Sequence, residues 1–538
     1  MSTFITPVSE LQRITKKRPH TAVFKVPQQS STGITFKDVT FTQFQKDVEL
    51  SARFWKDQLS KMGVQDRAVV GLWLKGYAYS DAVHIWGLNW AGFIPQLISL
   101  RMTDPTVIYE LLGKTEAAAL IYEPAFNDLL QTPPLPIFPA DDILSGRDLE
   151  KLPLASIWHP TNADDVLFVF HTSGSTSGIP KLVPLTARWV DDRLKLSEIV
   201  RTKGNRTRDH KVSLQIGSFC HFGATSLLWG AVSDGGCIAL PSVMPQPVSE
   251  IHHLLDEHGL SSLLMFPPSL SALLREARKN PSLLASLRKA DVLGSGGLEP
   301  DPADVAWARS QGFCMLNAVS STELGMVMMS NGKENTDELE IVSGSKYELV
   351  PTGDKLVSGE DLLELIVPPE APNCPVPSLR DASDGKFHTG DLFIEVNPGK
   401  YLCKGRNDNW IKMEVALRCD TVSIEANVME TCGDDLVSAV VVVGVGRPCP
   451  TMIIEPRDKS LSSDGADAED AVRELKEDVL RRITPFHKRR YMHERIDDTR
   501  YIIVVPQGTL PRTVTKGNVR RKEAEQAFET VLNAVYAK

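Results

Sequence analysis

Short apolar runs alternate with helix-like segments through the first 320 residues, as repeated strand-helix-strand units require. Residues 67–74 are predicted to form a strand, and residues 80–90 a helix that packs on it. Thr103-Asp104-Pro105 has the order of a helix cap followed by proline in the first turn, which predicts a helix through Leu112. Further strands are predicted at residues 117–122, 166–170, 237–240, 262–266 and 291–293. The alternation predicts α/β layering that occurs twice.

The pattern changes at about Glu338 to short strands and turns, and prolines become frequent between the strands. A small β-rich subdomain is therefore expected, with strands at residues 362–367, 392–396 and 401–404. Beyond Gly405 the pattern becomes α+β, with strands at residues 437–443 and 501–505, a charged helix at residues 467–483 and a final helix from Lys522. We expect an α/β protein with a large N-terminal core over residues 1–406 and a small C-terminal domain over residues 407–538.

Composition limits the function classes. A chain of 538 residues with 42% apolar and 24% charged residues is typical of a large soluble enzyme. The net charge of −9 argues against a nucleic-acid-binding protein, which would carry an excess of Lys and Arg. The basic stretch from Arg201 to Lys211 is interpreted as a solvated loop, with a site for a phosphate-bearing partner as the alternative.

Cysteine usage and the N-terminal residues indicate the compartment. The 8 cysteines contain no CxxC pair, and they are interpreted as thiols in a reducing environment. The N-terminus lacks the basic and apolar regions of a secretory signal, and nowhere do 18 apolar residues run together. We expect a soluble cytoplasmic protein without a membrane partner.

One segment combines glycine, hydroxyl residues and a terminal lysine directly after an apolar strand. Its sequence is His171-Thr172-Ser173-Gly174-Ser175-Thr176-Ser177-Gly178-Ile179-Pro180-Lys181. Glycines let backbone N–H groups approach phosphate oxygens, the hydroxyls add donors and the lysine adds positive charge. The spacing differs from that of a Walker loop, so the pattern disfavours a kinase or motor NTPase. The alternative is a flexible surface loop.

Three further features accompany this segment. Asn317-Ala318-Val319-Ser320-Ser321-Thr322-Glu323 follows an apolar run, where Glu323 could bind Mg²⁺ and Thr322 a phosphate oxygen, although a Thr-Glu pair is also a common helix cap. Thr389-Gly390-Asp391 places an aspartate after a predicted tight turn, where it could accept ribose hydroxyls or belong to a simple β-turn. The last feature is Gly405-Arg406-Asn407-Asp408, with Leu510-Pro511-Arg512-Thr513-Val514-Thr515-Lys516-Gly517 near the C-terminus.

In this order and at these separations, the four features resemble the adenylate-forming superfamily, which contains acyl-CoA and aryl-CoA synthetases, luciferases and adenylation domains of nonribosomal peptide synthetases. The resemblance implies a core of two α/β subdomains and a β-rich one, followed by a small mobile domain that moves about the hinge Asp408. It implies that the chain uses ATP and Mg²⁺ to activate a carboxylic acid as an acyl adenylate, with release of pyrophosphate. It also implies catalytic roles for Thr172, Lys181, Glu323 and Lys516, with Glu323 as the metal-associated acid. Implied nucleotide contacts are Thr172, Ser173, Gly174, Ser175, Thr176, Gly178, Lys181, Asn317, Ser321, Thr322, Asp391 and Arg406.

Two segments resemble the parts of these enzymes that surround the carboxylic acid substrate. Phe219-Cys220-His221-Phe222-Gly223 resembles a pocket-lining segment, and Gly294-Ser295-Gly296-Gly297-Leu298 resembles the strand end that faces it. The candidate pocket residues are His221, Phe222, Thr225, Ser295, Gly296, Ala318 and Val319. For His221, packing and substrate contact are both retained as interpretations. The first segment lacks the aspartate that holds the amino group in amino-acid-activating domains, so a non-amino acid, such as an aryl acid, is expected.

The sequence as a whole, including Leu510-Pro511-Arg512-Thr513 followed by Lys516-Gly517, most resembles fungal nonribosomal-peptide-synthetase-like enzymes and carboxylic acid reductases. This similarity implies transfer of the acyl group to the phosphopantetheine of a carrier domain, in cis or in trans, within secondary metabolism. Free CoA is the alternative acceptor, as in a stand-alone acyl-CoA or aryl-CoA ligase. A catalytically idle nucleotide-binding regulatory module is the third reading. It is motivated by Val319-Ser320 in place of the common aromatic-glycine pair, by the order Lys516-Gly517, and by residues 413–418 without a glycine. Glu425 still matches the glutamate that closes this last motif.

Overall fold

The first large sheet has the strand order β6-β5-β3-β4-β7-β8. Its strands are β3 (Val69–Trp73), β4 (Ile94–Ile98), β5 (Ala119–Tyr122), β6 (Ile137–Pro139), β7 (Val166–Thr172) and β8 (Lys181–Thr186). The pairs β3–β4, β3–β5, β5–β6 and β4–β7 are parallel. Every residue of β4 and β5 is buried, as expected of parallel strands that are covered on both faces. The strands predicted at 67–74, 117–122 and 166–170 are confirmed.

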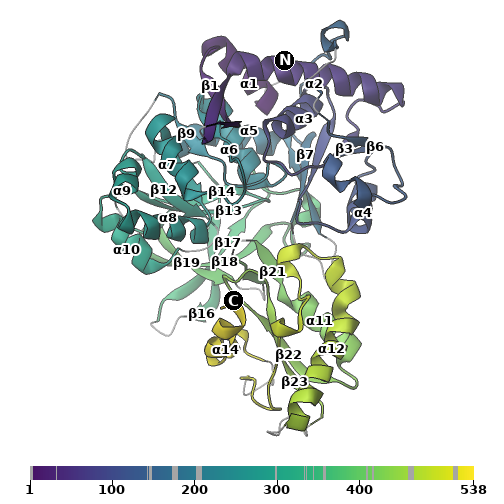
Figure 1. The fold of residues 1–538 in the computed structure, drawn as a ribbon, viewed down its shortest axis with the longest axis vertical. Helices are drawn as coiled ribbons and strands as arrows, with labels where there is room; N and C mark the ends of the chain where they lie inside the picture. Colours follow the sequence, from purple (N-terminus) through teal and green to yellow (C-terminus); the bar gives the residue numbers. More distant parts are fainter. Residues whose placement is uncertain are drawn as a thin grey trace. The chain divides into compact units, whose positions relative to one another are not determined.

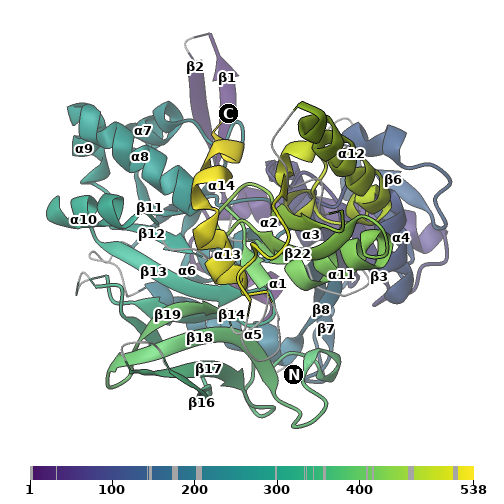
Figure 2. The same ribbon diagram turned by 90° about the horizontal axis from the view of Figure 1, so that it is seen from below.

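The second sheet has thirteen strands. In spatial order they are β16 (Glu348–Lys355), β17 (Asp361–Val367), β18 (Phe387–Asn397), β19 (Lys400–Arg406), β15 (Leu339–Ile341), β14 (Gly325–Ser330), β13 (Met315–Ser321), β12 (Val292–Gly296), β11 (Leu260–Met265), β9 (Val212–Leu214), β10 (Cys237–Ala239), β1 (Ala22–Ser30) and β2 (Gly33–Thr40). Strands β9 to β13 pair in parallel, whereas β13 and β14 are antiparallel. The predicted β-rich part is therefore continuous with the α/β sheet, because the edge of β13 pairs with β14. In Figure 2 the sheet can be followed from β11, β12 and β13 to β18, β17 and β16.

Helices cover both faces of this sheet. On one face lie α7 (Val248–Glu257), α8 (Pro267–Lys279), α9 (Pro281–Leu287) and α10 (Pro302–Ser310), and on the other α5 (Ala187–Arg201) and α6 (Phe222–Asp234). Leu263 and Met315 point to the first face, and their neighbours Leu264 and Leu316 to the second. This alternation is the period of two that a strand imposes.

The C-terminal region forms a small sheet of β22 (Val437–Val443), β23 (Thr451–Pro456) and β24 (Ile502–Val504). Helices α11 (Thr421–Cys432) and α12 (Ala466–Lys488) share one apolar cluster with Val440 and Val442. Helices α13 (Arg521–Ala527) and α14 (Glu529–Tyr536) share another with Val441 and Val443. Both faces of β22 are buried, which explains the uninterrupted apolar run of the strand predicted at 437–443, here confirmed.

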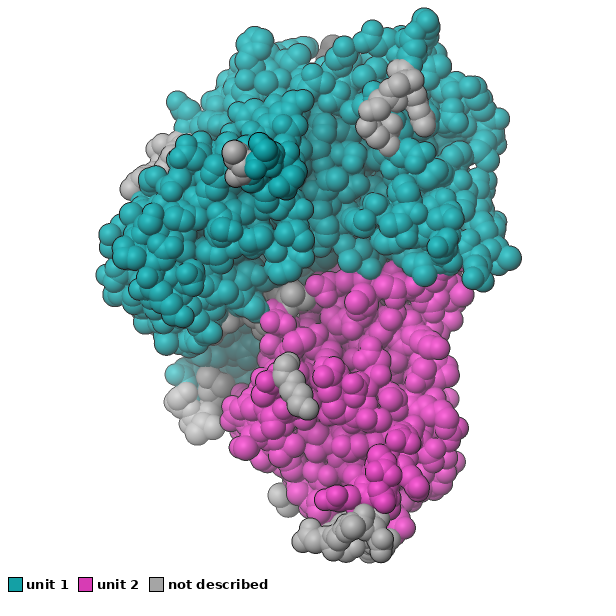
Figure 3. Space-filling view, viewed as in Figure 1, with its two compact units in different colours: residues 1–100, 112–171, 182–407 teal, residues 101–111, 172–181, 408–538 magenta. Residues whose placement is uncertain are grey.

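The computed structural model describes residues 4–31, 33–141, 143–144, 148–172, 180–201, 209–296, 300–332, 334, 336–342, 344–355, 359–406, 410–414, 417–458, 466–512 and 519–537. The chain divides into two units, one of residues 1–100, 112–171 and 182–407 and the other of residues 101–111, 172–181 and 408–538 (Figures 1 and 3). Within the described ranges, no helix is long and apolar enough to cross a membrane.

Candidate active site

The turn at Thr322-Glu323 lies between β13 and β14, at the strand end where the sequence predicts it. Only 7% of Glu323 is exposed, and its carbonyl oxygen accepts a hydrogen bond of 2.9 Å from Nε1 of Trp189 on α5. The backbone N–H of Leu324 donates to Oγ of Ser321 at 3.2 Å. The conformation of the turn therefore depends on the Glu323 backbone, on Trp189 and on Ser321, and the turn keeps these three supports if the Glu323 carboxylate is changed.

Arg193, also on α5, supports the same region. Its Nη1 donates to the carbonyl oxygen of Met326 at 2.8 Å. Sequence reasoning missed both Arg193 and Trp189, because they lie on a helix without a local motif. Only the contacts of a folded chain identify them as supports of the turn.

The strand ladder brings several predicted site residues together. Ser295 is paired with Asn317, and Gly296 with Ala318, on the adjacent strands β12 and β13. The N–H of Asn317 also donates to Oγ of Ser330 on β14 at 2.9 Å. The segments around Ser295 and Asn317, which the sequence nominated separately, thus lie side by side where the parallel strands β12 and β13 end.

Thr389-Gly390-Asp391 forms a bulge inside β18 and not the tight turn that the sequence suggested. The ladder to β17 shifts register between Glu364 and Ile366, where one residue of β17 lies opposite residues 389–391 of β18, as a bulge with extra residues requires. Gly390 adopts a φ of +69° and donates its N–H to Glu364 Oε1 at 3.1 Å. Oγ1 of Thr389 accepts from the Asp391 N–H at 3.0 Å.

The bulge places Asp391 opposite Arg406 in the register of β18 and β19. Asp391 is only 5% exposed. The two residues to which the resemblance assigns the ribose contacts are therefore neighbours in one ladder. The side chain of Arg406 lies outside the described part of the structure.

The glycine- and hydroxyl-rich segment is described only at its ends. Thr172 ends β7 and Lys181, which is exposed, begins β8. Before it, Nε2 of His171 accepts the N–H of Ser99 at 2.9 Å, and burial, with the nearby His221, lowers the pKa of His171 to about 3. A neutral imidazole suits an accepting Nε2. The other predicted residues here, Ser173, Gly174, Ser175, Thr176 and Gly178, lie outside the described residues, as do Asp408 and Lys516.

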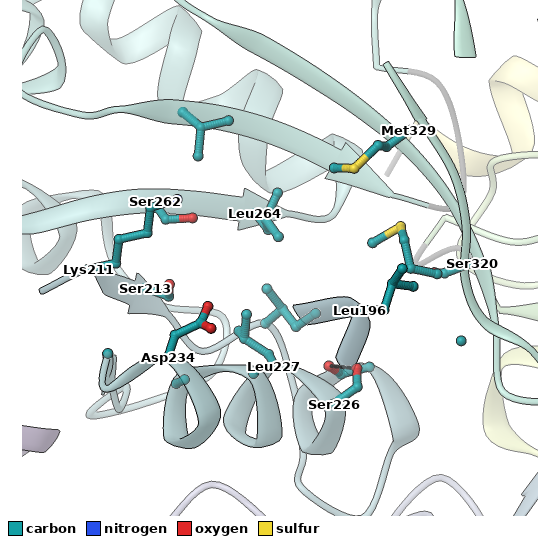
Figure 4. A pocket seen from close by; sticks show the side chains of 18 of the residues that line it. Leu196, Lys211, Ser213, Ser226, Leu227, Asp234, Ser262, Leu264, Ser320 and Met329 are labelled. Atoms are coloured by element: carbon teal, nitrogen blue, oxygen red, sulfur yellow. Dashed lines mark hydrogen bonds between the residues drawn. The ribbon is translucent and has the colours of Figure 1, made fainter. Parts of the chain in front are cut away.

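A cavity of about 270 Å³ lies between α6 and the sheet. Helix α6 lines it with mostly small residues, Phe222, Gly223, Ser226, Leu227, Gly230, Ala231 and Asp234. The strands add Ser213, Ser262, Leu264, Leu316, Ser320 and Met329 (Figure 4). One end of the cavity reaches Ser320, three residues before Glu323. The cavity thus extends to the strand that leads into the turn at Thr322-Glu323.

Of the seven residues that the sequence nominated for the acid pocket, Phe222 lines this cavity. Nδ1 of His221 accepts the N–H of Gly223 at 3.3 Å and caps α6. The Thr225 hydroxyl donates to the carbonyl oxygen of Phe219, and Val319 packs against the apolar cluster that contains Leu324. These contacts give His221, Thr225 and Val319 packing or capping partners.

The residues present suit a magnesium ion that is bound together with phosphates. Mg²⁺ is usually held by one or two carboxylates and substrate phosphates, and not by a cage of protein ligands. Glu323 supplies one carboxylate at the end of β13. Among the described residues there is no group of three or more His, Cys, Asp or Glu that could hold a metal by itself.

Glu425, which matches a glutamate of the thiol-transfer motif, has a structural environment. Its Oε1 accepts the N–H of Val442 at 2.7 Å and an ion pair from Arg521. Arg521 also donates to the Val442 carbonyl oxygen at 2.6 Å. Glu425 therefore joins α11 to β22 and α13.

A buried carboxylate fixes the base of the segment that contains Lys516. Glu455 on β23 is 2% exposed and accepts the Leu510 N–H at 2.9 Å on Oε1 and Arg512 Nη2 at 2.7 Å on Oε2. Arg512 in turn forms a bridge to Val519 across residues 513–518. Both contacts to Glu455 are charge-assisted and the carboxylate is shielded from water, so they are strong for their kind. Sequence reasoning did not nominate Glu455.

The resemblance assigns adenylate formation to Lys516, and on that basis we predict that Glu455→Gln lowers acid-dependent exchange of pyrophosphate into ATP by about 10- to 100-fold, because displacement of such a lysine would lower the rate steeply. Transfer of the acyl group from a chemically prepared acyl adenylate to a thiol should keep its rate, because that step needs a different set of groups. The two half-reactions are measured separately. Glu477→Gln, at an exposed position on α12, is the matched control. An equal loss in both half-reactions would show that Glu455 acts on stability alone.

Comparison with known proteins identifies relatives over most of the chain. Residues 12–346 match the family of AMP-binding enzymes, and residues 408–538 match the C-terminal domain of AMP-binding enzymes. The AMP-binding domain-containing enzyme iboA of Amanita muscaria (strain Koide BX008) is 32% identical over 94% of this chain and 98% of its own length. The adenylate-forming reductase stbB of Stachybotrys bisbyi is 23% identical over 96% of this chain, which spans only 48% of that relative.

Among solved structures, the fold is similar to that of the A-PCP didomain of carboxylic acid reductase from Segniliparus rugosus in complex with AMP. The TM-score is 0.71 at 14% identity, over 99% of this chain and 83% of that chain. The similarity supports the predicted fold class, an α/β protein with a large N-terminal domain and a small C-terminal domain.

Proposed function

Because this chain belongs to the family of AMP-binding enzymes, which form acyl adenylates, we propose that it activates an aryl or other non-amino acid and passes the acyl group to the phosphopantetheine thiol of a carrier domain. The observation that carries the proposal is the cavity whose end at Ser320 lies on the strand that leads to Glu323. In this proposal residues 1–406 bind ATP and the acid, and residues 407–538 carry Lys516 and move about Asp408.

Adenylate formation joins a carboxylate oxygen of the acid to the α-phosphorus of ATP while pyrophosphate leaves. Negative charge on the oxygens around phosphorus is greatest in the transition state, where fixed donors and cations are most effective. We assign these roles to Thr172, Lys181 and Lys516. Bound Mg²⁺ would supply further positive charge, with Glu323 as its protein ligand. Asp391 would hold the ribose hydroxyls and so fix the nucleotide.

The cavity supports an acid without an α-amino group. Its lining beside Ser320 includes the apolar Leu196 and Met329 and the cation Arg193, which donates to the carbonyl oxygen of Met326. Of the acidic lining residues, Asp234 lies at the opposite end beside Lys211 (Figure 4), and Asp209 precedes Lys211 by two residues. A carboxylate that paired with an α-amino group would have to lie close to the reacting carboxyl, and so near Ser320.

The acceptor is inferred from the relatives. The chain spans about half the length of stbB, which is an adenylate-forming reductase, and its fold is similar to that of an adenylation domain joined to a carrier domain. A carrier in cis or in trans therefore suits the proposal better than free CoA, and a role in a carboxylic acid reductase follows from the same likeness.

The proposal is tested with labelled pyrophosphate. Exchange of the label into ATP is measured with a panel of aryl, aliphatic and amino acids, and we expect exchange with aryl acids above that of the Lys516→Ala protein. Incubation with free CoA or with a phosphopantetheinylated carrier domain, followed by mass spectrometry of thioesters, then separates the two acceptors. A panel without any exchange above the Lys516→Ala background would contradict the proposed activity and favour an idle nucleotide-binding module.

A further inference from the structure

The two ends of the acid cavity differ in chemistry. The end at Ser320 is bordered by Leu196 and Met329 and by Arg193, which donates to the carbonyl oxygen of Met326, whereas Lys211, Ser213, Asp234 and Ser262 gather at the other end (Figure 4). The walls between the two ends are mostly apolar, with Ser226 on α6 as a polar residue. Such an arrangement suits a ligand that is apolar along its length and polar at both ends.

The polar end is built by the regular geometry of the fold. Ser213 and Ser262 lie on β9 and β11 and face α6, because their neighbours Val212 and Leu263 pack against the helices of the opposite face. Asp234 is the last residue of α6. Rigid strands and the end of a packed helix therefore fix the position of these polar groups.

Lys211 belongs to the basic stretch that the sequence suggested to be a solvated loop. The structure places Lys211 immediately before β9, half-buried in the lining of the cavity. Asp209 lines the same end and is exposed, so this end borders solvent. Neither interpretation of the stretch, a solvated loop or a phosphate site, anticipated a role for Lys211 in the cavity.

Resting on the proposed function, we infer that the activated acid carries a hydroxyl, amine or other hydrogen-bonding group at the end remote from its carboxyl group. The carboxyl group lies at the Ser320 end, and the remote group binds at Ser213 and Ser262, beside Lys211 and Asp234. Within the described part of the chain, the structure gives the hydroxyls of Ser213 and Ser262 no hydrogen-bond partner, so both can bind the ligand.

An acid that lacks the remote group would place hydrocarbon against the polar end of the cavity and displace its water. This is unfavourable, so the site selects against such an acid. Leaving a buried hydroxyl without a hydrogen-bond partner costs more free energy than a typical hydrogen bond contributes. A site built to bind a substrate hydroxyl therefore rejects the deoxy compound strongly, whereas an apolar pocket discriminates weakly.

The length of the cavity sets the size of the acid. Phe222 and Asp234, the first and last residues of α6, both line it, and the helix advances about 18 Å between them at about 1.5 Å per residue. A medium-length aliphatic chain, or an aromatic ring extended by such a chain, has this reach. The inferred substrate class is an extended aliphatic or aryl acid with a hydroxyl or amino group at the end remote from its carboxyl group.

The test compares matched acids with and without the remote group. Dodecanoic acid is paired with 12-hydroxydodecanoic acid, and 6-phenylhexanoic acid with 6-(4-hydroxyphenyl)hexanoic acid. Binding is measured by isothermal titration with a non-hydrolysable ATP analogue present, and turnover by pyrophosphate exchange. In the wild-type protein we expect the hydroxylated member of at least one pair to bind about tenfold more tightly, the gain of about one hydrogen bond.

The double variant Ser213→Ala/Ser262→Ala should bring this ratio close to one and leave the affinity for the deoxy acid unchanged. Ser310→Ala, at an exposed position on α10, is the matched control and should keep the wild-type ratio. A wild-type ratio of one in both pairs, or a ratio that persists in the double variant, would overturn the inference. The wild-type comparison decides it even if the double variant fails to fold.

Binding and exchange separate this inference from the proposed function. A hydroxyl preference in binding without exchange by any acid would support the remote polar site and contradict acid activation. Exchange that is equal for both members of each pair would support acid activation and overturn the remote polar site.

Discussion

Replacement of Lys516 by alanine is expected to lower acid-dependent pyrophosphate exchange by about 10²- to 10³-fold, the usual cost of removing one preorganised donor from a transition state. The α-phosphate carries its largest charge as the acid attacks and pyrophosphate leaves. A lysine that reaches this phosphate lowers the barrier of that step, whereas the later attack of a thiol on the acyl adenylate has no leaving pyrophosphate to stabilise. Pyrophosphate exchange should therefore be largely lost. The rate of transfer from prepared acyl adenylate should remain within about threefold of the wild-type rate, a change of under 1 kcal/mol in the barrier.

Lys522→Ala provides the matched control, since Lys522 is exposed on α13 in the same part of the chain. Its exchange rate should equal that of the wild type. If Lys516→Ala retained full exchange, the reversed order Lys516-Gly517 would signify that another group acts at the α-phosphate. Loss of both half-reactions, with a lowered melting temperature, would instead indicate a folding defect.

Glu323→Gln is expected to reduce exchange by about 100-fold at the magnesium concentration that saturates the wild type, because a neutral amide is a poor magnesium ligand. The apparent magnesium requirement should rise by at least about tenfold, the lower range for weakened metal sites. The turn should survive, since Trp189 and Ser321 hold it through the backbone and through Leu324. Magnesium titrations of the exchange rate give both quantities.

The isosteric change Glu257→Gln, at an exposed position near the end of α7, controls for the loss of one carboxylate. This protein should show the wild-type magnesium dependence. An unaltered magnesium requirement in Glu323→Gln would remove Glu323 from the metal site, even if the exchange rate fell.

The sequence predicts the elements of this fold better than their arrangement. The strand at 437–443 is predicted correctly because both of its faces are buried, so that apolarity alone reveals it. The sheet order is not visible in the sequence, because β13 pairs with β14 through backbone groups that every residue carries. For the same reason the pairing of β1 with β10, across more than 200 residues, has no local signal.

The candidate site shows the same division. The sequence nominates Glu323 and Asp391 through short motifs, because the chemistry proposed for them requires particular residue types at fixed spacing. Trp189 and Glu455 are missed because they act by position, and a tryptophan on a helix or a glutamate on a strand has no motif. Gly390 is read as part of a turn, although the structure uses its positive φ for a bulge. Both conformations require the same residue, so the sequence does not distinguish them.

The cavity has one wall on α6 and another on β13, and only β13 continues into Thr322-Glu323. Substitution of residues on α6, such as Gly230 or Ala231, would reshape the space proposed for the acid and leave the turn in place. Duplicated copies of such a gene could therefore diverge in the acids they accept while inheriting an unchanged reaction. For an engineer, the same partition makes α6 the helix to randomise when a new acid is wanted, and β13 the strand to leave alone.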